Sequence, residues 1–220
     1  MANHQRILIV GAAGLGRAFY SALASHDLAE TVVGFLDDGG CKEFCGRPIL
    51  GRCRELSSMI RRHRVTQVGL GVGYRFFQDR QELISLINES GCEWASAVHA
   101  SAIVNPDVRL GRGVFIGAGS VVNAGTRIGD HGVLWSGVII EHDNQIEEDV
   151  YMATGVMTAG YVTIRAHAFI GMGSIIAKCT VGSYATVGAG SLVLRDVPDR
   201  TYAWGRPAKA VKRKPTLAYV

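Results

Sequence analysis

A large aliphatic residue recurs at every sixth position through the second half of this chain. Counting in sixes from Val98 reaches an aliphatic or Met side chain at every step as far as Ile176, apart from Thr158. The count then slips by one residue and resumes from Val181 to Val193. A fixed short period is typical of a solenoid, whose successive coils bury one row of side chains. An antiparallel sheet would instead need alternation with a period of two and repeated hairpin dipeptides, and neither recurs here.

The residues around this row fit short strands joined by tight corners. Two residues before most of its members lies a small or β-branched side chain, and glycine often follows the row. The chain holds 28 glycines in 220 residues and 5 prolines, whereas glycine usually makes up about 7% of a protein. A glycine excess without proline indicates many tight turns in a regular β structure.

The first 95 residues follow a different pattern, in which strands and helices alternate. We expect strands over 7–10, 31–36 and 65–70, and helices over 17–25, 55–63 and 79–90. Such alternation predicts a small parallel sheet. The expected organisation is an α/β domain over 1–95, an all-β solenoid over 96–198 and a C-terminal tail over 199–220.

Charge and composition argue against several classes of protein. The formal net charge is +4, and four cations cluster near the C-terminal end (Lys209, Lys212, Arg213 and Lys214) rather than on one face of the protein, so we expect no nucleic-acid partner. No apolar run reaches the roughly 18 residues of a membrane span. Five cysteines without a CxxC pair fit free thiols in a reducing cytoplasm better than a disulfide or zinc framework. We therefore expect a soluble, cytoplasmic protein.

Both halves of the chain resemble one group of enzymes. The repeat resembles that of the hexapeptide-repeat acyltransferases, and Trp204–Lys209 resembles the G-x-P-A-[KR] end of those enzymes. Gly11–Gly16, Phe35–Asp38 and Gly71–Gly73 resemble the nucleotide-sugar domain of bacterial sugar acetyltransferases. The resemblance implies a Rossmann-like α/β domain followed by an all-β left-handed parallel β-helix, with 18 residues in each three-sided coil.

The same resemblance implies an activity. Enzymes of this group acetylate amino sugars carried on a nucleotide diphosphate, in bacterial glycan biosynthesis, and they form homotrimers with the donor groove between solenoids. We therefore expect acetyl-CoA-dependent N-acetylation of a nucleotide-linked amino sugar, most simply a 4-amino-4,6-dideoxy sugar. O-acetylation of a sugar or of sialic acid stays open, because a hydroxyl acceptor needs the same base. A non-catalytic trimeric scaffold that keeps the nucleotide pocket is the third interpretation.

The glycine loop at 11–16 is the candidate nucleotide site. It joins a strand to a helix N-terminus, where backbone N–H groups and the helix dipole attract a diphosphate. An acidic residue about twenty positions later can bind a ribose or a base. The spacing is G-x-x-G-x-G rather than G-x-G-x-x-G, so a packing turn remains the alternative. With the resemblance, the expected substrate-binding residues are Gly11, Ala13, Gly14, Leu15 (through its backbone), Asp37, Asp38 and Gly73.

His142 is the candidate catalytic base. It lies two residues beyond the inward Ile140, which points it away from the core, and Glu141 and Asp143 flank it. A carboxylate can fix the imidazole tautomer and stabilise its cation. An imidazole, whose ordinary pKa is about 6.5, can accept the proton of an attacking amine near neutral pH. A surface histidine in a charged run is the alternative.

The resemblance assigns further roles around this histidine. His142 and Asp143 match the catalytic His and the acid that follows it, and Gly160, one coil later, is the expected N–H donor to the thioester oxygen. Tyr151 stands where relatives carry a second histidine that contacts acetyl-CoA. The expected acetyl-CoA-binding residues are therefore Tyr151, Gly160, Met172 and Ala189.

Two other histidines lie two coils apart, at His131 and His167. Their spacing resembles that of the zinc ligands in hexapeptide carbonic anhydrases, but Met172 stands at the position of the third ligand. Two histidines alone make a poor zinc site. We expect no metal.

Overall fold

The computed structural model describes residues 5–74 and 77–212, which form two compact units that divide between Ala100 and Ser101. The division falls a few residues after the expected boundary at 95. No helix in the described part of the chain is long and apolar enough to cross a membrane.

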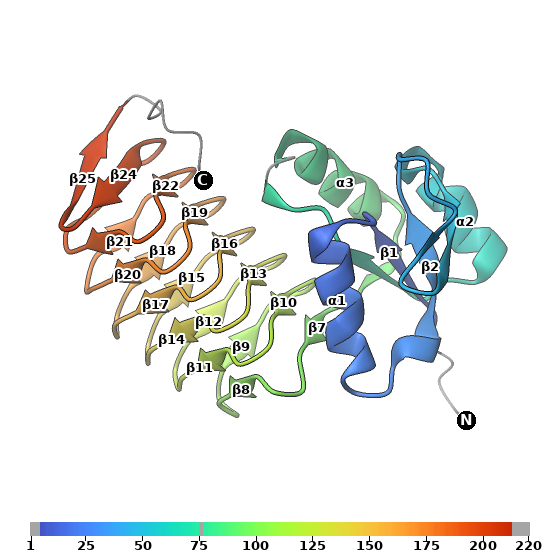
Figure 1. Cartoon of the computed structure of the whole chain (residues 1–220), viewed down its shortest axis with the longest axis horizontal. Coiled ribbons are helices and arrows are strands. Elements are labelled where there is room, and N and C mark those ends of the chain that lie inside the picture. The colour runs from blue at the N-terminus through green and yellow to red at the C-terminus, as the bar shows by residue number, and fades with distance from the viewer. Residues whose placement is uncertain (1–4, 75–76, 213–220) are drawn as a thin grey trace. The chain divides into compact units, whose positions relative to one another are not determined.

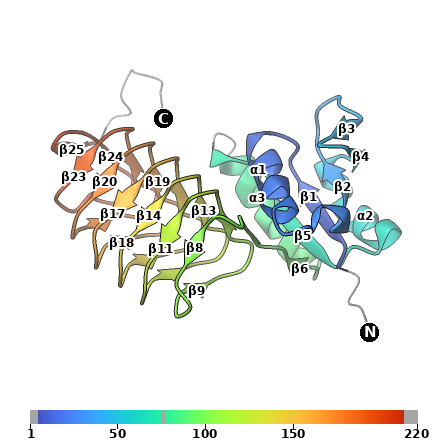
Figure 2. The same ribbon diagram turned by 60° about the horizontal axis from the view of Figure 1, so that its bottom comes forward.

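The N-terminal unit, at the blue end of the chain in Figure 1, is built on a sheet with the strand order β3-β4-β2-β1-β5-β6, whose strands are labelled in Figure 2. Every pair in it is parallel except β3–β4. The strands of this sheet are β1 (Ile7–Val10), β2 (Val32–Leu36), β3 (Glu43–Phe44), β4 (Arg47–Gly51), β5 (Gln67–Leu70) and β6 (Glu93–Trp94); the two-residue β7 (Ala97–Val98) lies outside it. The helices are α1 (Gly14–Ala24), α2 (Leu56–His63) and α3 (Phe77–Glu89). The expected alternation is observed, whereas the β3–β4 hairpin was not predicted.

The burial of the central strand explains why its sequence is a continuous apolar run without polar alternation. All four residues of β1 are buried, as in parallel strands that are covered on both faces. On α1 the buried side chains Leu15, Phe19 and Leu23 recur every four residues and form one apolar face. Ala13 at the N-cap makes no side-chain capping hydrogen bond, so a cap does not stabilise this helix. Its stability comes instead from burial of the apolar face.

The second unit is a parallel solenoid of two-residue strands that stack into three sheets (Figures 1 and 2). One sheet contains β8 (Ile103–Val104), β11 (Val121–Val122), β14 (Ile139–Ile140), β17 (Met157–Thr158), β20 (Ile175–Ile176) and β23 (Leu192–Val193). The next contains β9 (Arg109–Leu110), β12 (Arg127–Ile128), β15 (Gln145–Ile146), β18 (Thr163–Ile164) and β21 (Thr180–Val181). The third contains β10 (Phe115–Ile116), β13 (Val133–Leu134), β16 (Tyr151–Met152), β19 (Phe169–Ile170) and β22 (Thr186–Val187), and it continues into β24 (Tyr202–Gly205) and β25 (Ala208–Val211).

The register confirms the count in sixes. Neighbouring strands pair residues 18 apart, as in Ile140↔Thr158, and the spacing drops to 17 at Thr163↔Thr180, where the sequence count slips. The predicted row is buried from Ile116 onward, but Leu110 is 37% exposed. It lies on β9, an edge strand that has a neighbour on one side only.

These stacked parallel sheets fit the left-handed β-helix that the resemblance implies. Their corners place non-glycine residues in the left-handed backbone region, among them Asp143 (φ 56°) and Tyr161 (φ 61°). In the expected tail, residues 202–211 form the antiparallel β24–β25 hairpin. Arg213 and Lys214, the last cations expected in that tail, lie outside the described residues.

Candidate active site

His142 lies on a corner of the solenoid, between the end of β14 and the start of β15. Its side chain is 51% exposed, and Nδ1 lies 2.9 Å from Oδ2 of Asp143. A carboxylate only accepts hydrogen bonds, so Nδ1 carries the proton in this pair. Nε2 of the neutral ring therefore keeps its lone pair and can accept a proton.

Gly160 lies under this imidazole, one coil further along. A Cβ atom built on Gly160 would stand 2.6 Å from Cε1 and 2.7 Å from Nε2 of His142, which only glycine avoids. The flanking N–H groups of Ala159 and Tyr161 donate to Ile176 and His142. Within residues 5–74 and 77–212, the Gly160 N–H donates no backbone hydrogen bond. The predicted base and the predicted N–H donor are thus brought together.

Polar side chains that interrupt the apolar interior gather beneath His142. Asn144 is fully buried, and its Nδ2 donates to the carbonyls of Glu141 (2.6 Å), Ala159 (3.0 Å) and His142 (3.2 Å). Its Oδ1 has no partner in the described part of the chain. Turning the amide over would point that oxygen at three carbonyl oxygens, so the orientation is fixed.

The inward Thr158 also makes a polar contact with the backbone beside His142. Its Oγ1 accepts a hydrogen bond from the N–H of Glu141 at 3.3 Å, next to His142. Thr158 breaks the aliphatic row in the sequence, and neither Asn144 nor Thr158 is among the predicted site residues. Their polarity at inward positions is the signal that could have found them.

Tyr161 is a further neighbour of His142 that the sequence analysis missed. The two rings meet edge to face, with centroids 5.2 Å apart and planes at 89°. Tyr161 is 67% exposed, so this ring lies open to solvent beside the imidazole.

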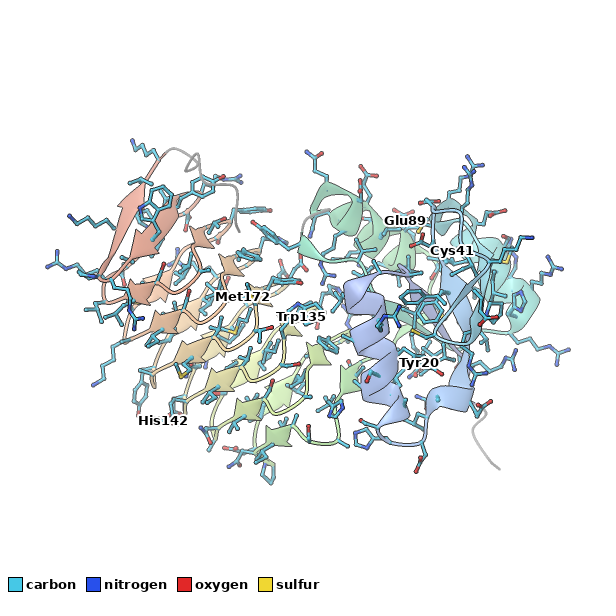
Figure 3. All side chains as sticks on the ribbon, viewed as in Figure 1. Tyr20, Cys41, Glu89, Trp135, His142 and Met172 are labelled. Carbon is cyan, nitrogen blue, oxygen red and sulfur yellow. The ribbon has the colours of Figure 1, made fainter. Side chains whose placement is uncertain are left out.

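The residues expected at acetyl-CoA do not all gather at His142 within one chain. Tyr151 lies on the β10–β22 sheet, where Trp135 Nε1 donates to its hydroxyl and Phe169 stacks on its ring at 5.5 Å. Met172, 59% exposed, and the exposed Ala189 lie at the corner after that sheet. Figure 3 shows Trp135 and His142 at different edges of the solenoid.

His131 and His167 lie at a third corner, together with Asp149. Oδ2 of Asp149 lies 3.4 Å from Nδ1 of His167, and the ring of Tyr184 lies 4.6 Å from that of His167. Among the described residues, no three His, Cys, Asp or Glu side chains form a group able to hold a metal ion.

The candidate nucleotide residues lie at the carboxyl ends of β1, β2 and β5. Since β2 and β5 lie on either side of β1, the glycine loop stands at a topological switch point, where α/β sheets commonly bind ligands. A Cβ on Gly16 would stand 2.0 Å from the carbonyl oxygen of Gly11, whereas nothing lies within 4 Å of a Cβ on Gly14. Gly16 therefore serves packing, and Gly14 faces open space at the start of α1.

The acidic pair after β2 shapes this loop. Asp37 accepts hydrogen bonds from the N–H groups of Ala12 and Gly39, both at 2.8 Å, so it ties the glycine loop to the end of β2. Asp38 accepts one from Cys53 N–H at 3.3 Å. Burial and the nearby Asp38 raise the pKa of the Cys53 thiol to about 12, which keeps it neutral.

The remaining predicted nucleotide residues fit backbone contacts. Leu15 is 3% exposed, so its side chain belongs to the core. Gly73 lies in the loop after β5, where the guanidinium of the buried Arg80 donates to the Val72 carbonyl at 2.7 Å.

Fold and site together define a hexapeptide-repeat transferase. The family model for bacterial transferase hexapeptide (six repeats) matches residues 107–142. A histidine-to-asparagine variant of perosamine N-acetyltransferase from Caulobacter crescentus, in complex with CoA and GDP-perosamine, is 31% identical with a TM-score of 0.87; the match covers 94% of this chain and 96% of that one. The chain belongs to the hexapeptide-repeat family of acetyl-CoA-dependent sugar acetyltransferases, as the sequence analysis expected.

Two further relatives agree with this assignment. The acetyltransferase domain of PglB from Neisseria gonorrhoeae FA1090 is 26% identical with a TM-score of 0.86, over 94% of this chain and all of that domain. GDP-perosamine N-acetyltransferase of Escherichia coli O157:H7 is 31% identical over 145 residues, 62% of this chain and 65% of that protein. This chain thus spans just under two thirds of the length of that curated relative.

Proposed function

We propose that this protein transfers the acetyl group of acetyl-CoA to the amino group of a nucleotide-linked 4-amino-4,6-dideoxy sugar. The observation that carries the proposal is the corner at which the His142 imidazole, hydrogen-bonded to Asp143, lies over Gly160. The GDP-perosamine bound by the Caulobacter relative supports a nucleotide-linked amino sugar as the acceptor.

The residues of this corner suit acyl transfer. The neutral amine attacks the thioester carbonyl, forming the C–N bond, and Nε2 of His142 takes the proton that the nitrogen loses. The N–H of Gly160 donates to the oxygen on which negative charge develops. When the C–S bond breaks, the imidazolium returns its proton to the leaving sulfur. Asp143 holds Nδ1–H and stabilises the charged ring in between.

The outward faces of the solenoid support the homotrimer. One outward row on the β8–β23 sheet is aliphatic or Met throughout: Ile103, Val121, Ile139, Met157, Ile175 and Leu192. The matching row on the β9–β21 sheet is polar: Arg109, Arg127, Gln145, Thr163 and Thr180. An apolar stripe of this length is rarely left in water, and in our proposal a second copy covers it.

A composite site also explains the scattered acetyl-CoA residues. His142 lies at the corner between the β8–β23 and β9–β21 sheets, opposite the β10–β22 sheet that bears Tyr151. In the proposed trimer, His142 and Gly160 of one copy face the groove residues Tyr151, Met172 and Ala189 of its neighbour. The nucleotide diphosphate binds at Gly14 and the N-terminus of α1.

An activity panel tests the proposal. Purified protein is incubated with acetyl-CoA and GDP-, UDP- or dTDP-linked 4-amino sugars, and free CoA thiol is measured. We expect turnover with at least one amino sugar, and a loss of roughly 10²–10⁴-fold in kcat for His142→Ala, the usual contribution of a general base. Full turnover by His142→Ala would refute the base assignment. Turnover with hydroxyl acceptors alone would favour the O-acetyltransferase, and no thiol release with any acceptor would favour the scaffold.

A further inference from the structure

We propose that Tyr161 is a positioning residue for the reaction, which holds the imidazole of His142 with Nε2 over Gly160. This inference rests on the proposed function, in which His142 is the base. It begins from the edge-to-face contact of the two rings, 5.2 Å between centroids at 89°.

The ring of Tyr161 is a third neighbour of the imidazole, in addition to Asp143 and Gly160. Asp143 holds the ring at Nδ1, and Gly160 lies against its Cε1–Nε2 edge. That hydrogen bond alone does not fix the ring, because the imidazole can turn about its Cα–Cβ and Cβ–Cγ bonds if the carboxylate of Asp143, itself 47% exposed, moves with it. The side chain of His142 is 51% exposed in the single chain, so the ring has room to turn. The ring of Tyr161 limits that rotation.

The backbone conformation at position 161 disfavours a bulky residue, so the presence of a tyrosine there needs a reason. Tyr161 has φ 61°, in the left-handed region that favours Gly, Asn and Asp over bulky residues. The corner itself requires this conformation, since Asp143 has φ 56° one coil earlier. An Asn or Gly at 161 would therefore fit the corner better, and burial within the single chain does not account for the aromatic ring, which is 67% exposed there. The contact that the ring makes within the chain is the one with His142.

The backbone of Tyr161 also ties the two coils together. Its N–H donates to the His142 carbonyl at 3.2 Å, so the same residue links the main chain of the base and contacts its ring. Removing the ring while keeping this hydrogen bond separates positioning from folding.

Two substitutions distinguish a positioning role of the Tyr161 ring from a role in folding. Tyr161→Asn keeps a residue suited to the left-handed corner and removes the ring, whereas Tyr161→Phe keeps the ring and removes the hydroxyl. The matched control is Tyr184→Asn, at another corner tyrosine with φ 57°, whose ring lies against His167. Thermal unfolding and light scattering check that each variant is folded and assembled like the unsubstituted protein.

With the nucleotide amino sugar that gives the highest turnover in the panel, we expect kcat of Tyr161→Asn to fall roughly 10- to 100-fold, the effect of a misplaced catalytic group. The KM for acetyl-CoA should stay within about twofold. Tyr161→Phe and Tyr184→Asn should keep kcat within about twofold. Unchanged kcat in folded Tyr161→Asn, or an equal loss in Tyr161→Phe, would overturn the proposal.

A measurement without substrate separates this inference from the proposed function. The NMR resonance of the Cε1 proton of His142 should shift in Tyr161→Asn, which loses the ring current, and stay in place in Tyr161→Phe. An unshifted resonance in Tyr161→Asn would refute the ring contact even if His142→Ala is inactive. Full activity of His142→Ala would instead refute the assignment of His142 as the base and leave the contact standing.

Discussion

Gly160 has a single hydrogen as its side chain, and that hydrogen leaves the space in which the imidazole lies. We expect Gly160→Ala to push the ring of His142 aside, because the new Cβ would stand 2.6 Å from Cε1. The half-exposed ring can swing into solvent, so the melting temperature should fall by only a few degrees, while kcat falls roughly 10²-fold. Steady-state kinetics and calorimetry check this. Equal losses of kcat and folded protein would instead place Gly160 in the fold alone.

At the scale of single residues, the repeat count predicts where a residue lies on the coil, but it does not predict which side chains contact one another. It placed His142 outside the core and Gly160 one coil later, and the structure stacks the two. Asn144 and Tyr161 were missed because their roles depend on side-chain contacts at a corner. The period records only which residues face inward, so a polar residue at an inward position, such as Asn144 or Thr158, is the trace that such a contact leaves in the sequence.

At the scale of elements, two glycines at the start of α1 have different roles: Gly16 is needed for packing, and Gly14 is available for binding. Gly16→Ala should destabilise the N-terminal unit by about 2 kcal/mol or more, because its Cβ would meet the Gly11 carbonyl oxygen. Gly14→Asp should leave stability unchanged or raise it by up to about 1 kcal/mol, since an acid suits a helix N-terminus. Its charge should repel the diphosphate and raise the KM for the nucleotide sugar at least roughly 10-fold.

Chemical denaturation and KM measurements for both substrates test this pair. The KM for acetyl-CoA should be unaffected by Gly14→Asp, which makes it the internal control. A Gly14→Asp enzyme with normal nucleotide-sugar KM would show that the diphosphate binds elsewhere.

Elements were predicted where the pattern was long and regular. The expected strands and helices of the N-terminal half lie within about three residues of their observed ends, the usual uncertainty of sequence-based boundaries, but the two-residue β6 was not predicted. The β3–β4 hairpin was missed because β3 has only two residues, Glu43 and Phe44, without an apolar alternation. It stays in place through the sheet, where β4 pairs with β2, and no local pattern records that pairing.

At the scale of the whole molecule, the aliphatic row on the β8–β23 sheet is the surface through which copies are proposed to associate. Met157 is 38% exposed in the single chain, so Met157→Glu costs the isolated fold little. In a trimer the same carboxylate would be buried without a partner, which is far more costly. We expect light scattering to show three chains of 23.6 kDa for the unsubstituted protein and smaller species for Met157→Glu.

The polar sheet supplies the matched control for this test. Gln145→Glu introduces the same carboxylate on an exposed position of the β9–β21 sheet, and we expect it to leave the assembly intact. If the site is composite, Met157→Glu should also lose most of its turnover, because His142 of one copy then lacks Tyr151 and Met172 of the next. Added at high concentration, the variant should regain activity in step with reassembly. A monomeric Met157→Glu enzyme with full turnover would show that one chain holds a complete site, and the grouping of acetyl-CoA residues across copies would be wrong.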